Sequence, residues 1–234
     1  MKILKSLGAF VLYTTLGYAQ QFHSNTGTYT LPLHTDKPLN VQVTIKTQNS
    51  FCATRFEFLT SDNELLLKDE FMMNKEKVTY DVPLRSGDYS LVYTARSGCT
   101  NKHFDISLVK SEGDFEQELN DTPSLATSMQ EKHSYVGALQ KYKDEDYYKI
   151  TIEKKSSVEF VFEHKVFQGF GSFNIDVLKS NSKTITSFTS TTSSSKDVKK
   201  LSLNAGVYFV KVSSPSFYSS LKQHKYNLSY RVSK

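Results

Sequence analysis

The sequence predicts an all-β protein made of two tandem antiparallel β-sandwich domains of jelly-roll-like type. Three observations favour this fold class: the composition, the alternation of apolar and polar residues, and an internal repeat. The chain of 234 residues contains 14 Tyr and 16 Phe but no Trp, and Thr, Ser and Val are abundant. Branched and aromatic side chains pack well on pleated strands. A chain of this length has room for two small domains.

Short runs in which apolar and polar residues alternate recur along the chain. A period of two, with turn residues between the runs, is typical of antiparallel strands with one buried face. Many short strands of this kind favour sandwiches. The apolar members of the runs are Val41-Val43-Ile45, Phe56-Phe58, Tyr89-Leu91-Tyr93, Phe104-Ile106-Leu108, Tyr148-Ile150-Ile152, Val158-Phe160-Phe162, Phe173-Ile175-Val177, Tyr208-Val210-Val212 and Tyr226-Leu228-Tyr230.

One turn motif occurs in each half of the chain. Gly87 and Tyr89 of the first half match Gly206 and Tyr208 of the second, and the flanking residues match as well. A Gly in a tight turn takes positive φ at little cost, and a core Tyr can direct its hydroxyl to a partner at the sandwich edge. The repeat therefore indicates two copies of one fold.

Between the two copies of the repeat lies an acidic stretch, SEGDFEQELND, at residues 111–121. Its acidic composition and its Gly favour a domain boundary. The predicted organisation is a signal peptide at residues 1–19, a sandwich domain with a disulfide at 20–110, an acidic linker at 111–121 and a second sandwich domain at 122–234.

The N-terminus has the layout of a secretory signal peptide. Lys2 and Lys5 precede an apolar run at residues 7–16, and Ala19 closes a stretch suited to cleavage. The apolar run is too short for a stable membrane anchor. We therefore expect cleavage after Ala19, a secreted or periplasmic protein and no membrane span. A buried N-terminal helix is the alternative.

Cys52 and Cys99 are the only cysteines. In an oxidising compartment such a pair usually bonds, and the chain-entropy model gives this loop about 4 kcal/mol of stabilisation. A catalytic Cys is the alternative, but no His-bearing motif accompanies either residue. Two cysteines alone also cannot form a closed zinc site.

The formal charge of +5 is spread along the chain, and acidic and basic residues alternate. The two lysine pairs, at 154–155 and 199–200, are short and lack the interleaved aromatic residues of a nucleic-acid platform. The charge pattern indicates lysines that solubilise exposed strands and turns. We therefore expect no nucleic-acid partner.

The second half carries a series of short motifs in a fixed order. They are Glu118-Leu-Asn120-Asp121-Thr122, Ala126, Gly137-Ala-Leu139, Asp144-Glu-Asp146-Tyr147-Tyr148, Leu203-Asn-Ala-Gly206-Val-Tyr208-Phe-Val210 and Tyr226-Asn-Leu228. With these motifs, about residues 114–234 resemble the bacterial pre-peptidase C-terminal (PPC) domain family. Its members are β-sandwich modules often appended to secreted proteases, and the collagen-binding domains of clostridial collagenases look like close structural relatives. The first half, about residues 22–110, keeps the Gly-Asp-Tyr turn but lacks the acidic opening, and we interpret it as a diverged relative.

The resemblance implies a structural calcium ion. In the collagen-binding domains an acidic linker ligates calcium together with aspartates from a later loop. Alternation within the linker would place its side-chain oxygens on one side of an extended segment, and calcium takes six to eight oxygen ligands. An exposed acidic linker without a metal is the alternative. The matching positions are Glu116, Glu118, Asn120, Asp121, Asp144 and Asp146.

No enzyme is predicted. No two of the six histidines have the spacing of a zinc protease motif, and the sequence has neither a Gly-x-Ser-x-Gly elbow nor a phosphate loop. Asp144 and Asp146 could be a glycosidase pair, but nothing supplies the sugar cleft or an acid with a raised pKa.

The sequence instead predicts a non-catalytic binding or accessory module that recognises an extracellular protein or polysaccharide. Phe167, Phe170 and Tyr218 fall in predicted loops and are the candidate ligand-binding residues, because exposed aromatic clusters mark partner sites. Tyr208 and Tyr226 follow the strand pattern and are expected in the core. The alternative is a chaperone, inhibitor or processing helper of a secreted hydrolase.

Overall fold

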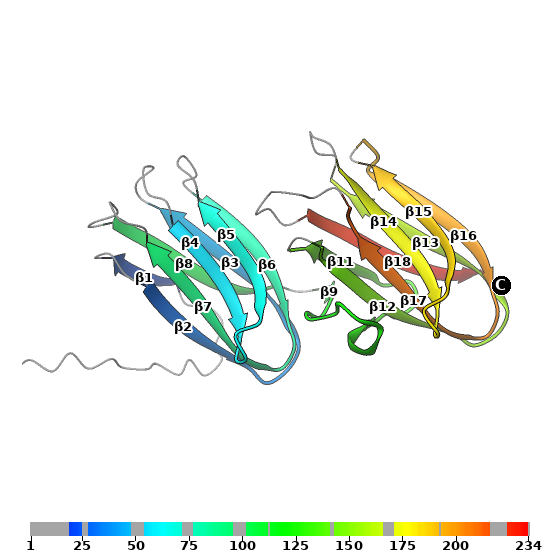
Figure 1. Cartoon of the computed structure of the whole chain (residues 1–234), viewed down its shortest axis with the longest axis horizontal. Coiled ribbons are helices and arrows are strands. Elements are labelled where there is room, and N and C mark those ends of the chain that lie inside the picture. The colour runs from blue at the N-terminus through cyan, green and yellow to red at the C-terminus, as the bar shows by residue number, and fades with distance from the viewer. Residues whose placement is uncertain are drawn as a thin grey trace, which may run out of the picture.

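The computed structural model describes residues 19–24, 28–47, 54–71, 77–95, 102–111, 113–140, 143–165, 171–191, 193–215 and 224–233. These residues form four mainly antiparallel sheets arranged as two sandwiches, which confirms the predicted fold class (Figure 1). Several predicted features lie outside the described residues: most of the signal peptide, Cys52, Cys99, Phe167, Phe170 and Tyr218.

The first sandwich packs a sheet of order β1-β8-β3-β6 against a sheet of order β2-β7-β4-β5. Its strands are β1 (Ala19–Ser24), β2 (Thr28–Thr35), β3 (Leu39–Thr47), β4 (Thr54–Thr60), β5 (Leu65–Phe71), β6 (Lys77–Leu84), β7 (Gly87–Ala95) and β8 (Lys102–Ser111).

The second sandwich packs a sheet of order β16-β13-β18-β11-β9 against a sheet of order β10-β12-β17-β14-β15. Its elements are β9 (Asp114–Phe115), the short 3₁₀-helix η1 (Pro123–Leu125), β10 (Thr127–Ser128), β11 (Ser134–Leu139), β12 (Glu145–Ile152), β13 (Ser156–His164), β14 (Ser172–Lys179), β15 (Thr184–Thr191), β16 (Lys196–Leu203), β17 (Gly206–Ser213) and β18 (His224–Ser233).

The two sandwiches have the same strand topology. Strands β11 to β18 occur in the same relative order as β1 to β8, so that β11-β18-β13-β16 corresponds to β1-β8-β3-β6. The second domain adds β9 at the edge of one sheet and β10 at the edge of the other, and both pair in parallel. Among the described residues, the two domains therefore differ by the segment that leads into β11 and β12 of the second domain.

The repeated turns confirm the internal repeat. Gly87 and Gly206 have φ values of 151° and 153°, a region that favours glycine. In each domain the following Tyr donates its hydroxyl to the carbonyl oxygen four residues before it: Tyr89 to Arg85 at 3.1 Å and Tyr208 to Asn204 at 3.0 Å. Identical geometry at matched positions shows that the turn is a property of the fold.

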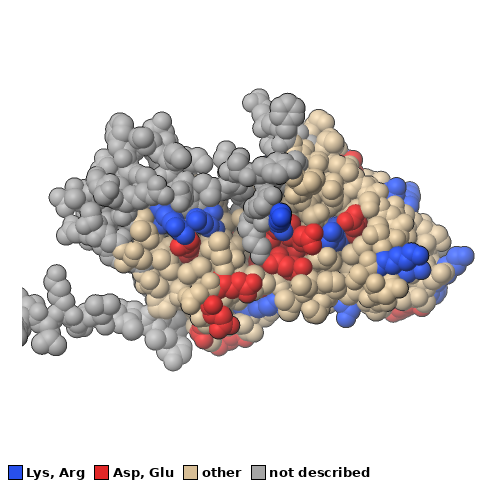
Figure 2. Space-filling view, viewed as in Figure 1, with Lys and Arg blue, Asp and Glu red and all other residues tan. Residues whose placement is uncertain are grey.

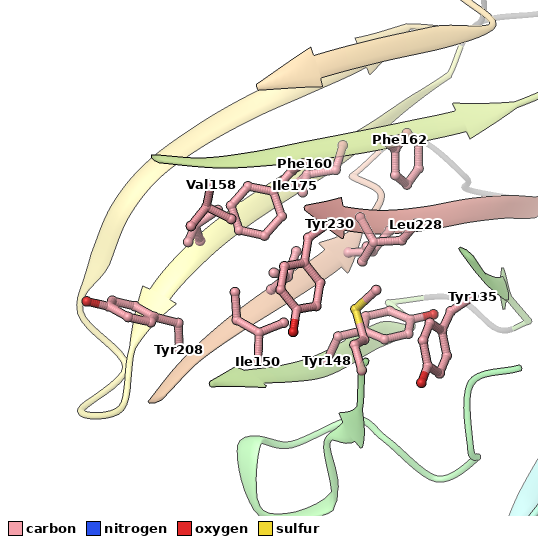
Figure 3. Close-up of a cluster of buried hydrophobic side chains, with 14 of the residues drawn as sticks. Tyr135, Tyr148, Ile150, Val158, Phe160, Phe162, Ile175, Tyr208, Leu228 and Tyr230 are labelled. Atoms are coloured by element: carbon pink, nitrogen blue, oxygen red, sulfur yellow. The ribbon is translucent and has the colours of Figure 1, made fainter. Parts of the chain in front are cut away.

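Each sandwich buries its own core. The predicted alternating residues with described side chains are almost all buried, with Leu108 only partly so. In the second domain Tyr208, Tyr226 and Tyr230 are 7%, 2% and 5% exposed, which confirms that they are core residues. Figure 3 shows this core with Tyr208 at one end and Tyr135 and Tyr148 at the other.

Lysines and arginines are interspersed with acidic residues on the face shown in Figure 2, as the sequence predicted. In the part of the chain that the structure describes, no helix has the length and apolar character needed to cross a membrane.

Candidate metal centre at the start of the second domain

The segment from Asp114 to Ser128 is hydrogen-bonded to both sheets of the second domain. Its β9 pairs with β11, and the Glu116 amide donates to the Val136 carbonyl at 3.0 Å. The Asn120 carbonyl accepts a hydrogen bond from the Tyr147 amide at 2.9 Å, and β10 pairs with β12. The acidic segment is therefore the first part of the second sandwich.

This pairing turns alternate side chains of the segment inward. Glu116, Glu118 and Asn120 are only 1%, 4% and 0% exposed. The residues between them, Gln117 and Leu119, are half-buried on the other side. The shared side expected from the sequence is thus the interior of the domain.

The inward side chains meet the beginning of β12. One carboxylate oxygen each from Glu116, Glu118 and Asp146 lies within 4.8 Å of the others. Asp144 and Asp146 are also buried, at 3% and 0% exposure. Two segments more than twenty residues apart in the sequence thus place their carboxyl groups around one point. Asp121, the sixth predicted ligand, is half-buried and is not one of the three in this group.

Hydrogen bonds from the surrounding strands hold these carboxyl groups. Glu116 accepts the Ala138 amide on Oε1 at 2.6 Å and the Tyr148 hydroxyl on Oε2 at 3.0 Å. Asp146 accepts the Tyr226 hydroxyl on Oδ2 at 2.5 Å. The two tyrosine hydroxyls are themselves 2.8 Å apart. The carboxyl groups are therefore oriented by core residues.

Gln140 completes the set, and sequence reasoning missed it. Its side-chain Nε2 donates to Glu118 Oε1 at 2.8 Å, and its backbone amide donates to Asp144 Oδ2 at 2.5 Å. Gln140 directly follows β11 and lies four residues before Asp144. Its position in the sequence gave no periodic signal, because its contacts depend on how β11 and the acidic segment are brought together in the fold.

Gly137 allows the two tyrosines to approach the cluster. A Cβ at this position would lie 2.3 Å from Tyr148 Oη and 2.4 Å from Tyr226 Cζ. Real Cβ atoms do not approach other heavy atoms so closely, so any larger residue would displace the hydroxyls that bind the carboxyl groups. The resemblance pointed to Gly137 as a motif position, and the structure supplies the physical reason.

Several oxygen atoms of the cluster have no hydrogen-bond partner among the described residues. They are Asn120 Oδ1, Asp146 Oδ1 and Gln140 Oε1, and all three are buried. Leaving a buried polar atom unpaired costs about 1–3 kcal/mol. Unpaired carboxyl and amide oxygens that converge with carboxylates are the ligand type that calcium prefers. The residues present therefore fit a calcium ion.

Burial dominates the electrostatics of the cluster. Burial raises the pKa of the Glu116 carboxyl well above its usual range, and the nearby Glu118 charge raises this pKa further. The pKa of Asp146 is also raised well above its usual range, first by burial and then by the charge of Glu116. Ionised carboxylates at this depth therefore cost free energy unless a positive charge offsets them.

The opposite side of the same segment contacts the first domain. The Arg85 guanidinium donates to the carbonyl oxygens of Glu118 at 3.0 Å, Gln117 at 3.1 Å and Leu125 at 2.5 Å. The Leu119 side chain packs against the core of the first domain. One short segment therefore directs carboxylates into the second domain and carbonyls and an apolar side chain toward the first.

A His, a Ser and an Asp also meet within the second domain, but not as a catalytic triad. Ser190 donates to Asp197 at 2.5 Å, and His164 Nε2 lies 3.0 Å from the same Ser oxygen. Ser190 and His164 are only 0% and 6% exposed. A hydroxyl this deeply buried and already bonded to a carboxylate is not presented to a substrate.

Comparison with known proteins gives similar structures but no family. No family model matches the chain, and no curated protein matches it. Tandem CBM51 modules of a family 98 glycoside hydrolase from Streptococcus pneumoniae have a TM-score of 0.29 and 8% identity, over 91% of this chain and 83% of that chain. The CBM22-1–CBM22-2 tandem of Xyn10C from Paenibacillus barcinonensis has a TM-score of 0.28 and 11% identity, over 92% and 87%.

A third similar structure holds the M60 catalytic domain and two CBM51 domains of ZmpB from Clostridium perfringens. Its TM-score is 0.31 at 8% identity, and the match covers 92% of this chain but only 34% of that one. Structures with TM-scores this low do not support a functional assignment. The two tandem β-sandwiches are seen directly in the sheets of this chain.

Proposed function

We propose that this protein is a secreted or periplasmic, non-catalytic binding or accessory module whose second domain is stabilised by a calcium ion. The observation that carries the proposal is the convergence of buried side-chain oxygens from the acidic segment and from β12. The PPC resemblance and the N-terminal sequence pattern support the same conclusion. The partner would be an extracellular protein or polysaccharide.

The donor set favours calcium over other ions. Glu116, Glu118, Asn120, Asp144 and Asp146 offer only oxygen atoms, the ligands of hard cations. Zinc would prefer Cys and His ligands. Magnesium usually keeps several waters, which an enclosed and fully buried site disfavours. The bound ion would supply the positive charge that ionised carboxylates require at this depth.

Burial argues for a structural role of the carboxylates. A general acid or base must come within hydrogen-bond distance of the substrate, but Glu116 and Asp146 are 1% and 0% exposed. A strongly raised pKa can mark a catalytic acid, yet structural networks also perturb pKa values. Here the raised pKa values follow from burial of several carboxyl groups in one place.

Calcium at this site would also order the junction between the domains. Glu118 presents its carboxyl group to the cluster while its carbonyl oxygen accepts a hydrogen bond from Arg85 at 3.0 Å. Fixing the side chain therefore fixes the backbone group that the first domain binds. The module would present both sandwiches to its partner in one arrangement.

Thermal unfolding of the full chain with calcium and with chelator tests the proposal. Calcium is expected to raise the melting temperature of the second domain, and Glu116→Gln is expected to remove most of that rise. Asp114→Asn is the matched control, because Asp114 lies in the same segment but bonds His133 at the surface, at 2.8 Å. An identical melting curve with calcium and with chelator would refute the calcium site.

A further inference from the structure

A groove of about 560 Å³ lies between the two domains, beside the carboxylate cluster. One wall comes from the β2–β3 turn and from the end of β8 in the first domain. The other comes from β9 and β10 and from the start of β11 in the second domain. This volume falls within the range of small-molecule sites, about 300–1,000 Å³.

Asn40 lines this groove and has no other assigned role. It lies on β3 between core residues of the first domain, and it is 1% exposed. Neither its side-chain oxygen nor its side-chain nitrogen has a hydrogen-bond partner among the described residues. A buried amide with both functions unpaired costs free energy. A ligand that offers a donor and an acceptor side by side would remove this cost.

The charges around the groove do not favour a charged ligand. Lys37 and Lys110 line it from the first domain, and Asp114 and Glu116 line it from the second. A cation would meet the two lysines and an anion would meet the Asp114 carboxyl group, whereas the Glu116 carboxyl group is turned into the second domain. Exposed Ser128 and Gln130 side chains add further neutral hydrogen-bonding groups.

The remaining lining residues distinguish a sugar from a peptide. The half-buried ring of Phe115 offers an apolar face against which a sugar ring can pack. A peptide would most readily add to a free strand edge, but the β9 edge is only two residues long. A pair of neighbouring hydroxyls donates and accepts at once, as the Asn40 amide requires.

We infer that this groove binds a neutral oligosaccharide, with Asn40 pairing two neighbouring hydroxyls and Phe115 packing against a sugar ring. The Asn40 amide is shielded in the free protein, so binding requires neighbouring groups of the groove to move and expose it. The inference rests on the proposed binding function and names the ligand class and the residues for it.

Calorimetric titration of the full chain in calcium tests the inference. The probes are neutral hexasaccharides of glucose, xylose, mannose and N-acetylglucosamine, with oligogalacturonate and casein peptides as the charged and peptide alternatives. We expect saturable binding of at least one neutral probe. Asn40→Ala is expected to weaken it about tenfold or more, the loss for a hydrogen bond pair of this kind.

The control is Ser157→Ala, because Ser157 occupies the matching strand position in the second domain and is exposed. Its affinity should equal that of the unchanged protein. Asn40→Ala removes an unpaired buried amide, so its melting temperature should not fall, and weaker binding would not reflect unfolding.

Three results would overturn the inference: no neutral probe binds, only the charged or peptide probes bind, or Asn40→Ala binds as tightly as the unchanged protein. In the last case the binding function would stand and only the groove assignment would fail. The calcium-dependent melting shift is measured in the same samples. If calcium does not shift the melting temperature, the calcium proposal is refuted, whether or not a sugar binds.

Discussion

The two domains share one strand topology and one turn geometry, yet among the residues that the structure describes the buried carboxylate cluster lies in the second domain alone. Strand register aligns Tyr148 of the second domain with Leu31 of the first, and Tyr226 with Phe104. The hydroxyls that bind Glu116 and Asp146 thus correspond to apolar residues. The shared strand topology therefore carries different residue types at these two positions.

The same alignment explains the glycine. Gly137 faces Tyr226 across β11 and β18, and the corresponding residue opposite Phe104 is Phe22. The second domain needs a residue without a Cβ because two hydroxyls must reach the carboxylates through that space. The cluster therefore depends on a leading segment, two tyrosines and one glycine that the second domain adds to the shared strand topology.

The largest expected effect is a reversal of sign for Glu116→Gln. In saturating calcium the variant loses a ligand and is expected to lose about 3 kcal/mol of unfolding free energy. In chelator it removes a buried like charge and is expected to be more stable than the unchanged protein. Denaturant unfolding under both conditions measures this, and a variant that is less stable in both would contradict a cation site.

A second expected effect concerns Gly137→Ala. The added methyl group overlaps Tyr148 and Tyr226, and overpacking of this kind costs about 1–3 kcal/mol. The loss should appear in the second domain only, and the calcium-dependent shift should shrink with it. Two-transition calorimetry separates the domains, and an unchanged second transition would show that the space is not required.

Arg85→Ala is expected to act between the domains. The change removes three hydrogen bonds to carbonyl oxygens of the acidic segment. Because the side chain is partly exposed at Leu125, we expect a loss of only about 1–2 kcal/mol. Limited proteolysis at the junction should become faster, and calcium should protect the variant less well. Equal protection of both proteins would separate the cation from the domain contact.

Tyr89→Phe and Tyr208→Phe form a matched pair. Each removes one hydroxyl bond to a backbone carbonyl in an equivalent turn. Each is expected to cost about 1 kcal/mol in its own domain. Strongly unequal losses would mean that the shared turn geometry does not give shared energetics.

The smallest expected effect is the pH response of His34, which has no ionisable counterpart in the second domain. Hydrogen bonds that the His34 ring donates to Asp88 and then to Asp36 raise the pKa of His34 above its usual value of 6.5. The group therefore adds stability below pH 6.5, and this contribution is lost as the pH rises through the folded-state pKa. NMR titration should show the raised pKa and its return toward the usual value in Asp88→Asn.

The strand pattern was predictable because alternation is a local property. Val41-Val43-Ile45 and Tyr148-Ile150-Ile152 alternate in sequence, and their side chains are buried as predicted. The two turns were also visible, since the Gly-x-Tyr spacing is short. The calcium ligands, in contrast, were suggested by the resemblance, and their convergence could not be read from residue spacing.

The parts that were missed depend on the path of the chain. Gln140 joins the cluster because β11 pairs with the acidic segment, which brings Gln140 to Glu118. Arg85 is remote in sequence from the carbonyl groups that it binds. Asn40 gave no signal, because a single Asn in a strand gains meaning only when the second domain places a groove beside it.

The fold class, the alternating core and the repeated turn follow from residue order alone, because side-chain period and glycine conformation act over a few residues. The burial of the acidic segment, the contact of its two sides with different domains and the residues that face the groove became visible only in the folded chain. These features arise from pairing between distant strands, where burial and proximity change the chemistry of residues that look ordinary in the sequence.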